Sequence, residues 1–170
     1  MHSRARVSNP ISIALISIVL ASTACDGKRS DPECSGMGCA CAGNTCACNL
    51  GADCDFECFD TGCSVGCNGA STCTAQGGDG ATFACNGMSH CDFEVGAMSS
   101  VACNGESTCT IQIESGIVAC NVESTCTVKC LGDCTTACNG ESDCEMTCGI
   151  AGTAPTTCAP TVFACGPCPF

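Results

Sequence analysis

The sequence predicts an all-β, disulfide-rich parallel β-solenoid, because it combines a short repeat, alternating side-chain polarity and a very high cysteine content. The chain has 170 residues, of which 25 are Cys, and it contains no Trp, no Tyr and only 6 Phe. A conventional core of large side chains cannot be built from this composition. Disulfide bridges are therefore expected to supply the stability that the core lacks.

The repeat is the pattern Cys-Asn-x-x-[Ser/Ala]-x-Cys, which occurs six times with copies 17–19 residues apart. Counted from the first Cys as position 0, positions 7 and 9 are polar and position 8 is apolar, which is the alternation of a strand with one buried face. A second short strand is expected just before each repeat. Each repeat then makes one coil, and about six stacked coils bury a shared core, although the handedness stays open. The copies begin at Cys48, Cys67, Cys85, Cys103, Cys120 and Cys138.

Asn-Gly follows the first Cys in four of the six copies, and we interpret it as a turn because both residues tolerate positive φ. Stacking should align the Asn and Ser columns as ladders along the solenoid. We place the repeat solenoid at 48–157, a Cys-rich N-terminal cap at 34–47 and a C-terminal cap at 158–170.

The N-terminus has the order of an export signal. Arg4 and Arg6 precede the ten-residue apolar run 11–20, which suits a signal peptide and is too short to cross a bilayer. Small residues then lead to Cys25, and this end resembles the signal of bacterial lipoproteins, although Ser22 departs from the aliphatic residue usual there. The resemblance implies that 1–24 is removed, that Cys25 is lipidated and anchors the chain to a membrane, and that 25–33 is a tether. Ordinary cleavage after Ala24 and secretion is the alternative.

The number of cysteines supports the lipid anchor. Exported proteins fold where thiols pair, and a lipid on Cys25 leaves an even number of other cysteines, enough for twelve bridges. The simplest pairing closes each coil on itself, although like positions of adjacent coils also come within reach. The intra-coil scheme predicts Cys48–Cys54, Cys58–Cys63, Cys67–Cys73, Cys85–Cys91, Cys103–Cys109, Cys120–Cys126, Cys130–Cys134, Cys138–Cys144, Cys148–Cys158 and Cys165–Cys168. It leaves the pairing of Cys34, Cys39, Cys41 and Cys46 open.

The charge balance is strongly acidic, with 17 Asp and Glu against 5 Lys and Arg. Removing residues 1–24 leaves three basic residues and a formal net charge of −14. A phosphate backbone would be repelled, so we expect no nucleic-acid partner. Outward carboxylates could instead form columns that bind calcium weakly through oxygen ligands. The candidate ligands are Asp53, Asp55, Asp92, Glu106, Glu123, Glu141, Asp143 and Glu145.

Three coils carry Thr-Cys-Thr, at 72–74, 108–110 and 125–127. This resembles the ice-binding face of beetle antifreeze solenoids, in which outward Thr residues flank an inward Cys, and the resemblance implies ice binding as a remote alternative. His90 and Asp92 interrupt the Thr columns.

The sequence predicts no enzyme, because it offers no assembled nucleophile and base and no phosphate-binding loop. We expect a non-catalytic structural or interaction module anchored to the cell envelope outside the cytoplasm. Its protein or surface partner is not identifiable from the residues, and no cofactor other than weakly bound calcium is expected.

Overall fold

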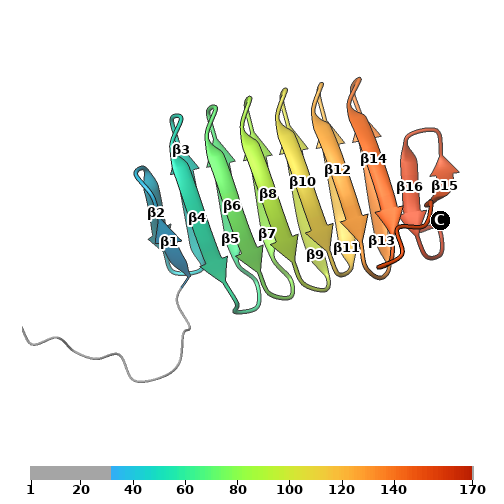
Figure 1. The fold of residues 1–170 in the computed structure, drawn as a ribbon, viewed down its shortest axis with the longest axis horizontal. Helices are drawn as coiled ribbons and strands as arrows, with labels where there is room; N and C mark the ends of the chain where they lie inside the picture. The colour runs from blue at the N-terminus through green and yellow to red at the C-terminus, as the bar shows by residue number, and fades with distance from the viewer. Residues whose placement is uncertain (1–31, 170) are drawn as a thin grey trace, which may run out of the picture.

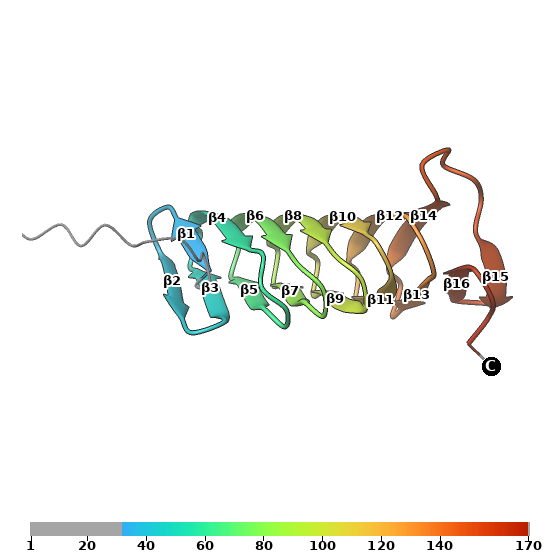
Figure 2. The ribbon, with the colours of Figure 1, turned by 90° about the horizontal axis from the view of Figure 1, so that it is seen from below.

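The computed structural model describes residues 32–169, so the predicted signal peptide, Cys25 and most of the tether lie outside the described residues. These residues form sixteen strands and no helix. The strands lie in two layers that run side by side along a rod, with its core between them (Figures 1 and 2). This is a parallel β-solenoid of about six coils, which confirms the predicted fold class.

Each coil contributes one strand to each layer. Sheet A has seven strands, in the order β1 (Glu33–Ser35), β4 (Asp53–Cys58), β6 (Thr72–Gly77), β8 (His90–Val95), β10 (Thr108–Ile113), β12 (Thr125–Cys130) and β14 (Asp143–Cys148). Sheet B has nine strands, in the order β15 (Thr156–Ala159), β16 (Val162–Cys165), β13 (Cys134–Asn139), β11 (Gly116–Asn121), β9 (Ser99–Asn104), β7 (Thr82–Asn86), β5 (Ser64–Asn68), β3 (Thr45–Asn49) and β2 (Cys39–Ala42).

Neighbouring coils pair in parallel with like repeat positions opposite one another. Cys109 lies beside Cys91 on one side and Cys126 on the other, and the same holds along both sheets. The ends break this pattern, because β1 pairs antiparallel with β4, β2 with β3, and β16 with both β13 and β15. These reversed strands occupy three of the four sheet ends, while β14 ends sheet A at the C-terminal side. The three reversed end strands have only three or four residues each, and short edge strands offer little unpaired backbone on which another chain could pair.

The inward side chains are those that the alternation predicts. Position 8 is buried in every coil, as Phe56, Ala75, Phe93, Ile111, Val128 and Met146. Large groups are accommodated by small neighbours: a Cβ on Gly77 would lie 2.6 Å from the Phe83 ring, so glycine at that position 10 makes room for Phe83. Phe83 in turn meets Phe93 edge-on across the core, with the ring centroids 5.2 Å apart.

Twelve disulfides cross-link the described residues and use all of their cysteines. Bridges between positions 0 and 6 join a sheet B strand to the following sheet A strand, as in Cys103–Cys109, so each coil is closed on itself. Eight bridges are the predicted pairs: Cys48–Cys54, Cys58–Cys63, Cys67–Cys73, Cys85–Cys91, Cys103–Cys109, Cys120–Cys126, Cys130–Cys134 and Cys138–Cys144. Cys34–Cys39 and Cys41–Cys46 close the N-terminal end.

Two predicted bridges, Cys148–Cys158 and Cys165–Cys168, are wrong. The structure joins Cys148 to Cys165 and Cys158 to Cys168 instead. The reason is the antiparallel return of β16 along β13, which carries Cys165 back over the last coil while Cys158 stays on the outer strand β15. Beyond the repeat, consecutive cysteines are therefore no longer bonded to each other.

The Asn column forms the predicted ladder. In each step the Nδ2 of one Asn donates to the Oδ1 of the Asn in the preceding coil, at 2.8–3.1 Å, through all six coils from Asn49 to Asn139. The Ser column is buried from Ser71 to Ser124. Ser71, Ser89 and Ser107 each donate from Oγ to the carbonyl of the Asn three residues earlier, at 2.7–2.8 Å. The serines thus fasten each turn while the asparagines fasten coil to coil.

The turn between Asn and Ser differs from the Asn-Gly interpretation. The two residues with positive φ are at positions 2 and 3 rather than 1 and 2, as in Gly105 (64°) and Glu106 (57°). Asn104 stays in its strand. Two consecutive left-handed residues form a tight type I′ connection, which glycine favours and which costs other L-residues about 1–2 kcal/mol each. Val122 nevertheless occupies position 2 with φ 53°.

Asn104→Ala should lower the free energy of unfolding by about 1–3 kcal/mol, because this residue donates to Asn86 and accepts from Asn121. Asn49→Ala is the matched control, since Asn49 lies at the end of the ladder and accepts a single hydrogen bond, from Asn68. Chemical denaturation of both oxidised variants measures the difference. Equal losses would mean that the ladder adds nothing to stability.

Val122→Gly should raise the free energy of unfolding by about 0.5–1 kcal/mol, because relief of the left-handed strain outweighs the added freedom of the unfolded chain. Gly105→Val at the same position of the preceding coil should lower it by a similar amount. A Cβ on Gly105 meets nothing closer than 3.7 Å, so backbone strain is isolated from steric clash. Thermal unfolding of the two variants measures the effect. Melting temperatures that shift in the same direction for Val122→Gly and Gly105→Val would contradict the explanation by backbone strain.

Candidate functional site

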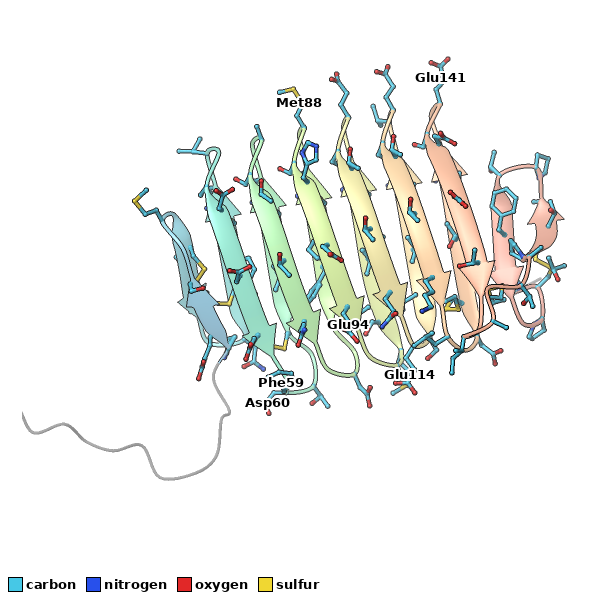
Figure 3. The ribbon with its side chains drawn as sticks, in the orientation of Figure 1. Phe59, Asp60, Met88, Glu94, Glu114 and Glu141 are labelled. Atoms are coloured by element: carbon cyan, nitrogen blue, oxygen red, sulfur yellow. A yellow bond between two sulfur atoms is a disulfide. The ribbon has the colours of Figure 1, made fainter. Side chains whose placement is uncertain are left out.

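The outer face of sheet A is the surface on which the sequence places the candidate ligands. Positions 5, 7 and 9 point outward from six strands, because positions 6, 8 and 10 point into the core. Parallel register aligns these positions into three rows along the rod, visible as side chains on the strands in Figure 3. Position 5 carries Asp53, Thr72, His90, Thr108, Thr125 and Asp143. Position 7 carries Asp55, Thr74, Asp92, Thr110, Thr127 and Glu145, and position 9 carries Glu57, Gln76, Glu94, Gln112, Lys129 and Thr147.

The threonines form two aligned rows on neighbouring coils. Thr108 lies beside Thr125, and Thr110 beside Thr127, in the parallel register of β10 and β12. The third Thr pair, on β6, is separated from them by His90 and Asp92 on β8. The structure therefore has an array of two adjacent coils plus one detached coil, bounded by acidic coils at both ends.

The predicted calcium ligands are not gathered at one place. Asp53 and Asp55 lie on β4, Asp92 lies two coils away on β8, and Asp143 and Glu145 lie on β14, three coils beyond. Among residues 32–169, groups of three or more potential metal ligands within 4.8 Å consist only of cysteines that are already in disulfides. The sheet A carboxylates therefore offer single contacts rather than a coordination shell.

The remaining three candidates form a separate column at the tight turns. Glu106, Glu123 and Glu141 occupy position 3 of three consecutive coils, and their backbones stack through bonds from Glu106 N to Val122 O and from Glu123 N to Gly140 O. Figure 3 shows Glu141 at the tip of its turn, pointing away from the rod. The three side chains of this column are exposed.

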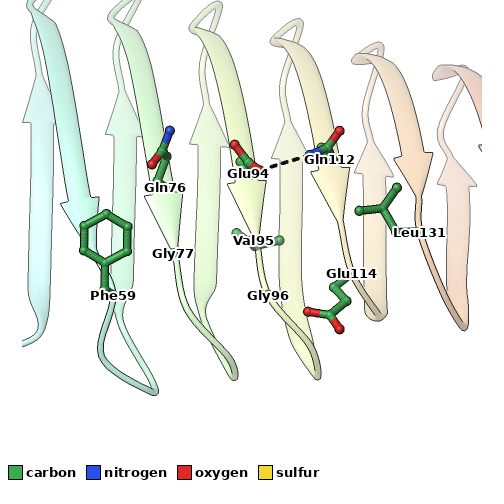
Figure 4. Close-up of a pocket in the computed structure, with 9 residues that line it drawn as sticks. All are labelled: Phe59, Gln76, Gly77, Glu94, Val95, Gly96, Gln112, Glu114 and Leu131. Atoms are coloured by element: carbon green, nitrogen blue, oxygen red, sulfur yellow. Dashed lines mark hydrogen bonds between the residues drawn. The ribbon is translucent and has the colours of Figure 1, made fainter. Parts of the chain in front are cut away.

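A shallow hollow of about 250 Å³ lies at the opposite margin of sheet A. Phe59 and Leu131 flank it, Gly77 and Gly96 lie along its floor, and Gln76, Glu94, Gln112 and Glu114 supply its polar groups (Figure 4). The Gln112 side chain donates to Glu94 Oε1 at 3.0 Å. The side chain of Phe59 is 58 % exposed although it is aromatic.

The sequence analysis did not predict this hollow, because it followed the alternation of polar and apolar residues only as far as position 10. Position 11 reads Phe59, Gly78, Gly96, Glu114, Leu131 and Gly149, so Phe59 and Leu131 flank two glycines and Glu114 along the rod. The glycines have a structural reason as well, since a Cβ on Gly78 would lie 2.6 Å from the Phe59 carbonyl oxygen. Reading the position 11 column across the coils would have revealed the hollow.

A second hollow on the same face brings His90 and Asp92 together with threonines of β6 and β10. No hydrogen bond joins His90 to Asp92 or to a threonine hydroxyl among the described residues. The hollow is a shallow recess in an open surface.

Comparison of the chain with protein-family models, with curated proteins and with solved structures gave no match. The class of protein is therefore defined by the fold, as a cysteine-rich parallel β-solenoid. Bridges of this number are typical of proteins that fold in an oxidising compartment outside the cytoplasm. In the described residues no helix is long and apolar enough to span a membrane.

Proposed function

We propose that the chain is a rigid, non-catalytic interaction module, held at the cell envelope by a lipid on Cys25 and binding its partner through the outer face of sheet A. The observation that carries the proposal is the stacked array itself. Bridged coils in strict register present polar side chains at a fixed spacing of about 4.8 Å. Such a surface is preorganised and suits recognition of an extended partner, because little ordering entropy remains to be lost on binding.

Charge indicates the kind of partner. Residues 32–169 contain fifteen Asp and Glu but one Lys and no Arg. Acidic groups occur on the first, third and last coils of the sheet A face, and Glu94 and Glu114 line its marginal hollow. A cationic partner, such as a basic protein segment or a basic surface, would be steered to this face and would lose affinity as salt rises.

The combined variant Asp92→Asn/Glu94→Gln should weaken binding of an oligolysine peptide several-fold, because it removes two carboxylates from the centre of the sheet A face. The matched control, Glu123→Gln/Glu141→Gln, removes the same charge from the turn tips. Fluorescence titration at low and physiological salt measures both affinities. Equal weakening by the two variants would reduce the effect to net charge and remove sheet A as the binding face.

Cys25→Ala should move the protein from the detergent-extracted membrane fraction to the soluble fraction, because the lipid and not a spanning helix holds the chain. Fractionation followed by intact mass determination of the processed N-terminus checks this outcome. Unchanged partitioning, together with an unmodified Cys25 in the parent protein, would rule out the anchor and leave a secreted module.

Weak calcium binding is a second proposal, and the turn-tip column of Glu106, Glu123 and Glu141 is the observation that favours it. Like charges on adjacent coils repel, and a shared divalent cation relieves that repulsion.

Glu123→Gln should therefore raise the melting temperature in calcium-free buffer. Millimolar calcium should reduce the difference in melting temperature between variant and parent, because calcium stabilises only the parent protein. Glu114→Gln, which removes one carboxylate from the other side of the rod, is the control. Calorimetric scans that show the same gap with and without calcium would leave the column as a solvated edge.

A further inference from the structure

The second large surface of the molecule, the outer face of sheet B, is free of charge. None of its nine strands contains an Asp, Glu, Lys, Arg or His. Every charged residue among residues 32–169 lies in a sheet A strand or in a turn. Figure 2 shows the two layers on opposite sides of the rod, so the charges are confined to one face and the edges.

Three rows of small, neutral side chains make up this face on the six coils from β3 to β13. One row is the Asn ladder described above. The middle row is Ala47, Gly66, Ala84, Ala102, Ala119 and Ala137, which the parallel register places side by side. The outer row is Thr45, Ser64, Thr82, Ser100, Ile117 and Thr135.

The Asn row has a structural reason, the ladder between coils, but the other two rows do not need to be free of charge for the solenoid to fold. Alternate strand positions that point to water tolerate charged residues, and exposed sheet faces usually carry them to prevent association. Here Ile117 is 60 % exposed in the outer row, between Ser100 and Thr135. One whole face of this acidic chain is therefore neutral, flat and partly apolar. Such a composition is typical of a surface that is buried in an interface.

We propose that the outer face of sheet B packs against the same face of a second copy of this chain, in an isologous dimer. Amide and hydroxyl groups both donate and accept hydrogen bonds, so these rows are chemically self-complementary. A second copy has the same coil spacing, so the rows match along the whole rod. The arrangement also turns both acidic sheet A faces outward, where their mutual repulsion is smallest.

The size of the face sets the strength of the contact. Five strand spacings of about 4.8 Å and strands of about 17 Å give a projected area of roughly 400–500 Å² per copy. Two copies would bury about 800–1,000 Å², which is at or just below the lower limit of specific interfaces. The dimer is therefore weak and reversible in solution, and confinement to a membrane surface strengthens it through a higher effective concentration. The inference does not depend on what sheet A binds.

Sedimentation equilibrium of the protein in its native processed form, over a wide range of concentration, should show a monomer–dimer equilibrium. Added salt should shift it toward dimer, because salt screens the repulsion between two acidic molecules while the interface contains no ion pair. Small-angle scattering should show that dimerisation increases the thickness of the particle and leaves its length unchanged.

Ala102→Arg, at the centre of the face, should weaken dimerisation at least tenfold, and Ser100→Arg provides a second variant should the first fail to form its bridges. Thr110→Arg, at the centre of sheet A, is the control and should leave dimerisation unchanged or stronger, since it reduces the net charge. Intact mass before and after reduction verifies the twelve bridges in each variant.

A monomer at every concentration and salt would overturn the proposal and leave the face to a partner other than a second copy. A dimer that lengthens the particle would mean end-to-end contact, and a dimer lost on Thr110→Arg but kept on Ala102→Arg would assign the interface to sheet A. Either result would also contradict the proposal.

Discussion

The closing of each coil by its own disulfide is the constraint on which the rest of the structure depends. Cys103–Cys109 and its five counterparts tie sheet B to sheet A beside the tight turn, one bridge in every coil. Chain entropy is the main cost of folding, and a core of valines, cysteines and a few phenylalanines offsets little of it. Small loops closed by bridges reduce the entropy of the unfolded chain, each by about 2 kcal/mol in the chain-entropy model.

Fixing both sheets also explains how the surface can be specialised. Because the bridges, the Asn ladder and the buried serines hold the coils in register, the other outward positions can vary without loss of the fold. Left-handed strain at Val122 and an exposed Phe59 are tolerated for the same reason. The two sheets then differ sharply, with one face carrying carboxylates, threonines and hollows and the other carrying only neutral, mostly small side chains.

The repeat made most of the solenoid predictable, because a fixed spacing determines which residues face inward and which cysteines meet within a coil. Prediction was wrong where the repeat stops: the partners of Cys148 and Cys158 depend on the antiparallel return of β16, which no local pattern encodes. The turn was placed one residue early, because Asn-Gly tolerates positive φ but Asn104 is held in the strand by the ladder. The hollow beside Phe59 and the charge-free face require reading down columns of stacked coils, and only the register defines those columns.

Disulfide mapping of the unreduced protein tests the central claim most directly. Glutamyl endopeptidase cuts after Glu106, Glu123 and Glu141, each of which lies inside a loop closed by a position 0–6 bridge. Digestion of the denatured, unreduced chain therefore separates the two cysteines of each of these three bridges. The account predicts pairs of peptides joined through Cys103–Cys109, Cys120–Cys126 and Cys138–Cys144. Bridges between like positions of neighbouring coils, such as Cys103 with Cys120, or free thiols at these positions, would contradict it.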